Sequence, residues 1–243
     1  MVDDYAATAA TYDLLTAAFR PAQEETLAQL LAVIDPTVGP LLDIGCGSGH
    51  LLAHALHTVP DLHGLGLEPS PAMRTLALAR FAGLPALHAR VTLRPEDATS
   101  APLPPRLSGA LAFGVLGHLH PDQRPALFRA LAPRLAGPFL FDLQAPDSPV
   151  AVPAYEFARA RLGELTYRGT AAGTPVGPHT MEWTMTYETC AGEAVIERAT
   201  MRTQVEHPPP PTVLAELAAA GFTARQLAGS RCWLAAGPAG ENR

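Results

Sequence analysis

Lysine is absent from this chain of 243 residues, so all 17 basic side chains are arginines. The net charge is −6 and no more than two arginines gather in close succession, so no nucleic-acid partner is expected. A chain without lysine also has no Tyr-x-x-x-Lys pair, which disfavours a nicotinamide-dependent oxidoreductase. All-arginine usage with abundant Ala, Pro and Gly indicates the coding bias of a GC-rich bacterial genome.

Cysteine is scarce, and long apolar runs are missing. Cys46, Cys190 and Cys232 are an odd, scattered set that predicts neither a disulfide framework nor a metal site. No apolar run is long enough to span a bilayer, and the acidic start 1–4 does not resemble a signal peptide. We therefore expect a cytoplasmic protein with no membrane partner and no metal, large enough for one α/β domain with an insertion.

A glycine-rich loop follows a short apolar run near the start of the chain. Residues 41–44 predict the end of a buried strand, and Gly45, Gly47 and Gly49 precede an apolar helical pattern that begins at Leu51. Glycine allows positive φ and the close approach of a ligand, while a helix N-terminus supplies free N–H groups and a positive dipole end. The segment therefore predicts a site for a nucleotide-like ligand.

The spacing of this loop argues against a dinucleotide. The pattern is Gly-x-Gly-x-Gly, with Asp43 two residues ahead of the first glycine. The dinucleotide fingerprint requires a third glycine three residues after the second, where this chain has His50.

Acidic side chains follow the next two predicted strands. Glu68 ends the strand predicted at 62–67, where a carboxylate can accept both hydroxyls of a ribose. Asp97 follows the strand predicted at 87–93. Because ligands bind outside the carboxyl ends of the strands in a doubly wound sheet, we expect these side chains and the glycine loop to share one site.

Alternating strand and helix patterns predict a doubly wound α/β fold. The helices are expected at 3–19, 23–34, 50–58, 121–135 and 212–220, with another after the N-cap Ser70. The remaining strands are expected at 109–116, 138–143, 223–228 and 231–236.

Residues 146–207 interrupt this pattern. A proline-rich, weakly helical piece at 146–163 precedes antiparallel strands expected at 164–171, 179–189 and 193–206. Apolar Met181, Trp183, Met185 and Tyr187 alternate with polar residues, which is typical of a sheet with one buried face. We therefore expect an inserted lid (146–207) over a core formed by 1–145, which includes an N-terminal helical cap, and 208–243.

Four segments resemble class I S-adenosylmethionine (SAM) methyltransferases over roughly residues 5–145. Residues 41–50 resemble their motif I, and residues 68–73 (Glu-Pro-Ser-Pro-Ala-Met) resemble the acidic-x-Ser-x-x-Met segment. Asp97-Ala98 matches the Asp-Ala that meets adenine, and residues 11–15 (Thr-Tyr-Asp-Leu-Leu) resemble the "YD" helix that covers SAM. The resemblance implies a Rossmann-like methyltransferase sheet of seven strands, the last one antiparallel, with an inserted antiparallel β lid after strand five.

The same resemblance implies SAM as the cofactor and S-adenosylhomocysteine as the product. The glycine loop would surround the amino-acid part of SAM, and the Arg20 guanidinium would suit its carboxylate. The expected cofactor residues are Tyr12, Arg20, Asp43, Gly45, Gly47, Gly49, Glu68, Pro69, Met73, Asp97, Ala98 and Leu116. One departure is local, since the family usually starts strand four with Asp and this chain has Ser108 or Gly109 there.

Within the family, the chain is most similar to the amino-sugar N,N-dimethyltransferases of macrolide pathways. The likeness rests on residues 113–119 (Phe-Gly-Val-Leu-Gly-His-Leu) and on the inserted sheet. In those enzymes the stretch after strand four faces the methyl group, so His118 is expected to act on the acceptor as a base or hydrogen-bond partner. Tyr5, Tyr155 and Trp183 are the further substrate contacts that we expect. The alternative for His118 is a helix-capping or core histidine.

The predicted function is SAM-dependent methylation of a small molecule in bacterial natural-product or antibiotic biosynthesis, with nitrogen favoured over oxygen or carbon as the acceptor. SAM supplies the activated methyl group, so the protein chiefly positions donor and acceptor. The alternative is a SAM-binding protein on the same fold that transfers no methyl group and acts as a cyclase or regulator. We expect a homodimer or a lidded monomer.

Overall fold

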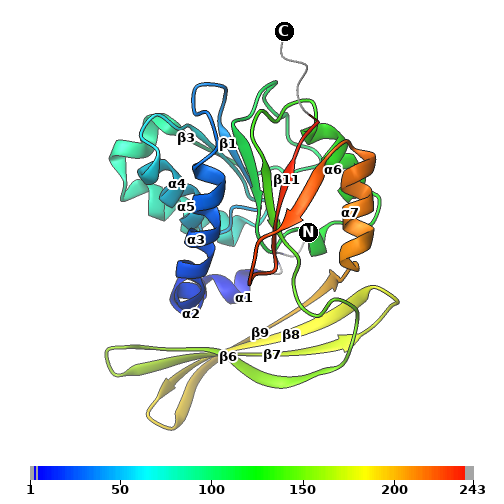
Figure 1. Cartoon of the computed structure of the whole chain (residues 1–243). Helices are drawn as coiled ribbons and strands as arrows, with labels where there is room; N and C mark the ends of the chain where they lie inside the picture. Colours follow the sequence, from blue (N-terminus) through cyan, green and yellow to red (C-terminus); the bar gives the residue numbers. More distant parts are fainter. Residues whose placement is uncertain (1–2, 4, 239–243) are drawn as a thin grey trace.

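A seven-stranded sheet forms the centre of the computed structural model, which describes residue 3 and residues 5–238. Its strand order is β10-β11-β5-β4-β1-β2-β3 (Figure 1). The strands are β1 Leu41–Ile44, β2 Gly64–Leu67, β3 Val91–Arg94, β4 Gly109–Ala112, β5 Phe139–Asp142, β10 Thr223–Gln226 and β11 Cys232–Ala236. The last strand, β11, is antiparallel to both β5 and β10, whereas β1 to β5 pair in parallel. The predicted fold class is confirmed.

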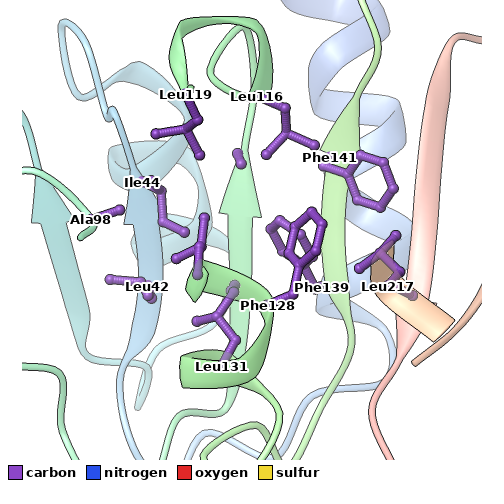
Figure 2. Close-up of a cluster of buried hydrophobic side chains, with 14 of the residues drawn as sticks. Leu42, Ile44, Ala98, Leu116, Leu119, Phe128, Leu131, Phe139, Phe141 and Leu217 are labelled. Atoms are coloured by element: carbon purple, nitrogen blue, oxygen red, sulfur yellow. The ribbon is translucent and has the colours of Figure 1, made fainter. Parts of the chain in front are cut away.

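Helices cover both faces of this sheet (Figure 1). One face carries α3 Arg20–Leu31, α4 His50–Thr58 and α5 Pro71–Ala82, and the other carries α6 Gln123–Leu131 and α7 Pro210–Ala219. Figure 2 shows the core on the α6–α7 face, where Phe128 and Leu217 pack with Phe139 and Phe141 of β5. Because β1, β2, β4 and β5 are buried on both faces, their sequences are short, mainly apolar runs.

The sheet reverses its strand order between β1 and β4. Strands β2 and β3 extend the sheet on one side of β1, and β4 and β5 extend it on the other. In open α/β sheets the crevice at such a switch point, outside the carboxyl ends of the strands, is where ligands bind. The glycine loop after β1 and the segment after β4 flank this crevice.

A second, four-stranded antiparallel sheet follows β5 in the chain and lies below the main sheet in Figure 1. Its strands are β6 Val152–Leu162, β7 Leu165–Pro175, β8 Thr180–Ala191 and β9 Ala194–Glu206. The weakly helical piece predicted at 146–163 is therefore wrong, because residues 152–162 of it form β6 and the rest is not helical. Ala, Arg, Glu and Leu in this segment favour a helix locally, but pairing with β7 decides the conformation.

The N-terminal segment lies between the two sheets (Figure 1). The single helix predicted at 3–19 is wrong: the segment forms α1 Ala6–Ala9, α2 Tyr12–Thr16 and the 3₁₀ turn η1 Ala17–Phe19. Thr11 leaves the helical conformation (φ −119°, ψ 0°), and the chain bends there. Leu15 packs with Tyr187 and Met201 of the second sheet, so that sheet buries its apolar face against the N-terminal segment.

The predicted strands at 87–93 and 109–116 have different bounds in the structure. Residues 85–90 form the 3₁₀ helix η2, Pro85–Arg90, so β3 begins only at Val91. Strand β4 ends at Ala112 and is followed by the 3₁₀ turn η3, Leu116–His118, which places His118 beyond the strand. No helix among the described residues is long and apolar enough to cross a membrane.

Gly117, in the 3₁₀ turn η3, lies directly against β9 of the second sheet. A Cβ built on Gly117 would lie 2.6 Å from Val205 Cγ1 and 2.7 Å from the Glu206 carbonyl oxygen. Only glycine therefore allows this close approach of the backbone of η3 to β9.

We predict that Gly117→Ala lowers the free energy of unfolding by about 1–3 kcal/mol, because the added methyl group forces η3 and β9 apart. Thermal unfolding measures the loss, and Gly83→Ala is the matched control. A Cβ at Gly83 meets nothing closer than 3.4 Å. Equal stabilities of the two variants would contradict the close contact at Gly117.

Candidate functional site

The glycine loop is joined to the loop after β2 by one carboxylate. Glu68 Oε2 accepts a hydrogen bond from the Gly47 amide at 2.8 Å, and Oε1 accepts one from the Ser70 amide at 2.8 Å. Gly45, Gly47 and Gly49 all have positive φ, as the sequence pattern predicts. A Cβ at Gly45 would lie 2.7 Å from Val115 Cγ2, so the segment after β4 also approaches this loop.

Two buried carboxyl groups lie beneath the loop. Burial, and then the negative charge of Glu68, raise the pKa of Asp43 to about 8. Burial also raises the pKa of Glu68, and its hydrogen bonds from Ser70 and Gly47 partly offset this. Asp43 is only 4% exposed. Because ionising either group in this low-dielectric place is costly, the site favours a cationic or hydrogen-bond-donating ligand.

Tyr12 and Met73 both lie close to the glycine loop. A Cβ built on Gly47 would lie 3.7 Å from the Tyr12 phenol oxygen and 3.6 Å from Met73 Cε. Burial, followed by the charges of Asp13 and Glu68, raises the pKa of Tyr12 to about 12, so the phenol stays neutral. Helix α5 starts as the sequence predicts, with Ser70 Oγ accepting from the Met73 amide at 3.1 Å.

An ionic cluster around Asp13 fastens the N-terminal segment to the loop. Asp13 Oδ1 accepts from Arg20 at 2.9 Å and from Ser48 Oγ at 2.7 Å, while Oδ2 accepts from Arg80. Arg80 Nε also donates to the Ser48 carbonyl oxygen at 2.8 Å. Arg20, expected at a carboxylate of the cofactor, pairs with Asp13 in this structure.

Neither Arg80 nor the role of Asp13 is evident from the sequence. Asp13 lies inside the Tyr-Asp segment that the resemblance singled out, but its partners lie in α5 and in the loop, far along the chain. Asp3 adds a second attachment, since its carboxylate accepts from Ser70 Oγ at 2.8 Å and from the Ala72 amide at 2.9 Å. The N-terminal segment is thus fixed at two points over the ligand edge.

Tyr5 and His118, both predicted to contact the substrate, come together. The Tyr5 hydroxyl lies 2.9 Å from His118 Nε2, and the two rings meet edge to face with centroids 5.9 Å apart. They come from distant parts of the chain, Tyr5 from the N-terminal segment and His118 from the turn after β4. His120, two residues on, is instead exposed and interacts with Asp122.

The other predicted site residues have different surroundings from Tyr5 and His118. The Asp97 carboxylate accepts from the Thr99 and Ser100 amides of its own turn; burial opposes ionisation, but these bonds prevail and lower its pKa. Ala98 and Leu116 belong to the core on the α6–α7 face, and Pro69 is exposed. Tyr155 is 47% exposed on the edge strand β6. Trp183 donates to His207 at the junction of the two sheets.

Metal ligation has no support in the described part of the chain. No group of three or more His, Cys, Asp or Glu side chains there is arranged to hold a metal ion.

Residues 42–137 match the sequence model of a family described as "Methyltransferase domain". The matched range contains the glycine loop, Glu68, Asp97 and His118. No curated protein sequence matches the chain significantly.

Several solved structures share the fold. SAM-bound CalS10, an amino pentose methyltransferase of calicheamicin biosynthesis from Micromonospora echinaspora, is 21% identical, with 90% of this chain and 94% of that chain covered and a TM-score of 0.71. DesVI from Streptomyces venezuelae is 21% identical, with coverages of 97% and 92% and a TM-score of 0.69. The sugar N-methyltransferase KedS8 from a Streptoalloteichus species is 20% identical, with coverages of 88% and 86% and a TM-score of 0.68.

We predict that Asp43→Asn flattens the pH dependence of stability. The folded-state pKa of Asp43, about 8, lies above the unfolded value of about 3.9, so the folded protein binds the extra proton. The contribution of Asp43 is therefore fully present below about pH 4 and is lost, by up to about 1.4 kcal/mol per pH unit, as the pH rises toward 8.

Denaturant unfolding of both proteins between pH 5 and pH 8 measures this effect. The asparagine variant should become the more stable protein, relative to the parent, as the pH rises. Parallel stability curves for the two proteins would show that Asp43 is ionised throughout.

Proposed function

We propose that this chain, with a methyltransferase domain at residues 42–137, transfers the methyl group of SAM to a nitrogen atom of a small amino-sugar acceptor in bacterial natural-product biosynthesis. The family match confirms the predicted methyltransferase class. The observation that carries the proposal is that the glycine loop, Glu68 and the Tyr5–His118 pair gather at the carboxyl edge of the sheet.

SAM fits the residues at this edge. Each Glu68 oxygen accepts one backbone N–H and keeps a second lone pair for a ribose hydroxyl. Asp43 is a buried carboxyl group that a nearby ammonium group would stabilise in its ionised form. The structures of CalS10 and of the glycopeptide N-methyltransferase MtfA contain SAM, which agrees with the expected cofactor. When bound, SAM supplies a methyl group activated by its sulfonium charge.

The side chains of the protein orient the acceptor and remove one proton from it. An amine attacks only when neutral, so an ammonium acceptor first gives a proton to a base. An imidazole nitrogen can accept such a proton, so His118 can serve as this base. Tyr5, 2.9 Å from Nε2, fixes the orientation of the imidazole ring. Holding donor and acceptor in line supplies most of the remaining acceleration.

The choice of an amino sugar follows the named relatives. CalS10 acts on an amino pentose, and KedS8 is a sugar N-methyltransferase. A histidine beside a tyrosine, with no need for a metal, suits an amine that must lose a proton. We further propose that residues 146–207 form a unit that covers the acceptor by supporting the N-terminal segment. The homodimer expected from the sequence stays a prediction.

We predict that Glu68→Ala weakens SAM binding by at least about 1.5 kcal/mol, or tenfold, because hydrogen bonds to a charged acceptor are lost. Isothermal calorimetry with SAM measures this. Glu96→Ala is the matched control, since Glu96 is a carboxylate two residues after β3 that pairs with Arg94. If Glu68→Ala binds SAM as tightly as the parent, the ribose assignment is wrong.

We predict that His118→Ala lowers the turnover of an amino sugar by about 10²–10⁴-fold while SAM affinity is retained. The rate should recover partly at high pH, because a deprotonated amine needs no base. Mass spectrometry that follows the gain of one CH₂ group measures turnover, and His120→Ala is the control.

Three outcomes of this experiment separate the roles of His118. Full turnover at every pH would make His118 a structural residue. A parallel loss of SAM binding would make it a cofactor residue. SAM binding by the parent without methylation of any amino sugar would favour a different acceptor or a protein that transfers no methyl group.

A further inference from the structure

A buried histidine joins the two connections between the main sheet and the second sheet. His207, directly after β9, is 3% exposed, and its Nδ1 lies 2.9 Å from the carbonyl oxygen of Pro146 in the connection after β5. On the other side of the ring, Trp183 Nε1 of β8 lies 2.9 Å from His207 Nε2. One imidazole therefore links β8 and β9 to the segment that leaves the main sheet.

These partners determine the protonation state of the ring. The indole N–H of Trp183 can only donate a hydrogen bond, so Nε2 must carry no proton and must accept it. The Pro146 carbonyl oxygen can only accept, so Nδ1 must carry the proton. His207 is thus the neutral Nδ1–H tautomer, and a second proton on the ring would remove the acceptor that Trp183 needs.

The junction lies beside the turn that carries His118. Val205 and Glu206, the two residues before His207, are those against which Gly117 packs. A small cavity at the same place is lined by Leu116, Gly117, Asp142, Gln144 and His207, among others. The Gly114 amide donates to Asp142 at 2.6 Å, which fixes the start of the turn. A shift of β9 at His207 would therefore reach the turn that carries His118.

We propose that neutral His207 is a positioning residue: by joining Trp183 to Pro146, it holds the second sheet against residues 113–118 and so keeps His118 in register with Tyr5. The effect on an acceptor rests on the proposed function. The packing of the second sheet against residues 113–118 does not rest on it.

Acid should release this contact. Burial, and after it the charge of Arg231, lower the pKa of His207, against the hydrogen bonds to Pro146 and Gln144 and the charge of Glu206, which raise it. The other ionisable groups at the junction are Asp142, Asp147, which pairs with Arg231, and the exposed His179. The pKa of His207 in the folded protein lies below the ordinary value of about 6.5. The hydrogen-bonded arrangement of His207 with Trp183 and Pro146 is therefore fully stable above about pH 6.5 and loses stability as the pH falls below it.

The first test is the tautomer of His207 in the full chain, read by ¹⁵N NMR of the histidine rings. His207→Gln identifies the signal by its loss. The expected result is the Nδ1–H form at neutral pH, with protonation only below about pH 6.5. The Nε2–H form, or titration at the ordinary value, would overturn the proposal.

The second test is hydrogen exchange of the peptide 113–119, corrected for intrinsic rates. Trp183→Phe keeps an aromatic ring on β8 and removes the N–H together with part of the indole, so it tests the same hydrogen bond by a second route if His207→Gln folds poorly. Exchange at 113–119 should be faster by about two- to tenfold in both variants. At about pH 5.5 the parent should approach the variants, whose rates should show no such pH step.

His179→Gln is the matched control, because His179 is exposed and meets His207 only through its backbone carbonyl oxygen. Unchanged exchange at 113–119 in Trp183→Phe and His207→Gln would overturn the positioning role. Neither readout uses turnover, so a failure to find methyl transfer would count against the proposed function alone.

Discussion

The Glu68 carboxylate, with one oxygen on the Gly47 amide and the other on the Ser70 amide, is the contact on which the rest of the site depends. It joins the loop after β1 to the loop after β2, and it fixes where helix α5 begins. The attachments of the N-terminal segment build on this frame. Asp3 binds the first turn of α5, and Asp13 binds Arg80 farther along the same helix.

Two buried carboxyl groups, Asp43 and Glu68, lie at the ligand edge. Asp43 and Glu68 both have a raised pKa, chiefly because burial disfavours their ionised forms. Such an arrangement lowers stability at neutral pH unless a ligand supplies positive charge or hydroxyl donors. Arg20 and Arg80 do not relieve it, since both are paired with Asp13. The edge is therefore built for binding at the expense of the stability of the free protein.

The sequence predicts the main sheet well because its signals are local. Apolar runs, glycine turns and the Ser70-Pro71 helix start each act within a few residues, and all are present in the structure. Strand β6 could not be predicted in this way, since its pairing with β7 overrides a composition that favours a helix. The break at Thr11 likewise follows from packing against a remote sheet.

The same distinction between local sequence signals and long-range contacts applies to the site. Tyr12, the glycines, Glu68 and Met73 belong to short motifs, and the structure brings these motifs close together. The contact between Tyr5 and His118 likewise joins two segments that the sequence singles out. Arg80 and His207 gave no local signal, because their importance lies in the partners that the fold brings to them. Trp183, expected at the substrate, directs its N–H to His207, a partner that its alternating pattern does not indicate.

The most direct test of the account is isothermal calorimetry of the unmodified protein with SAM, S-adenosylhomocysteine and NAD, each titrated separately. The arrangement of the glycine loop with Glu68 predicts that SAM and S-adenosylhomocysteine bind at one site per chain and compete with each other, and that NAD does not bind. Binding of NAD, or failure of both SAM and S-adenosylhomocysteine to bind, would contradict it.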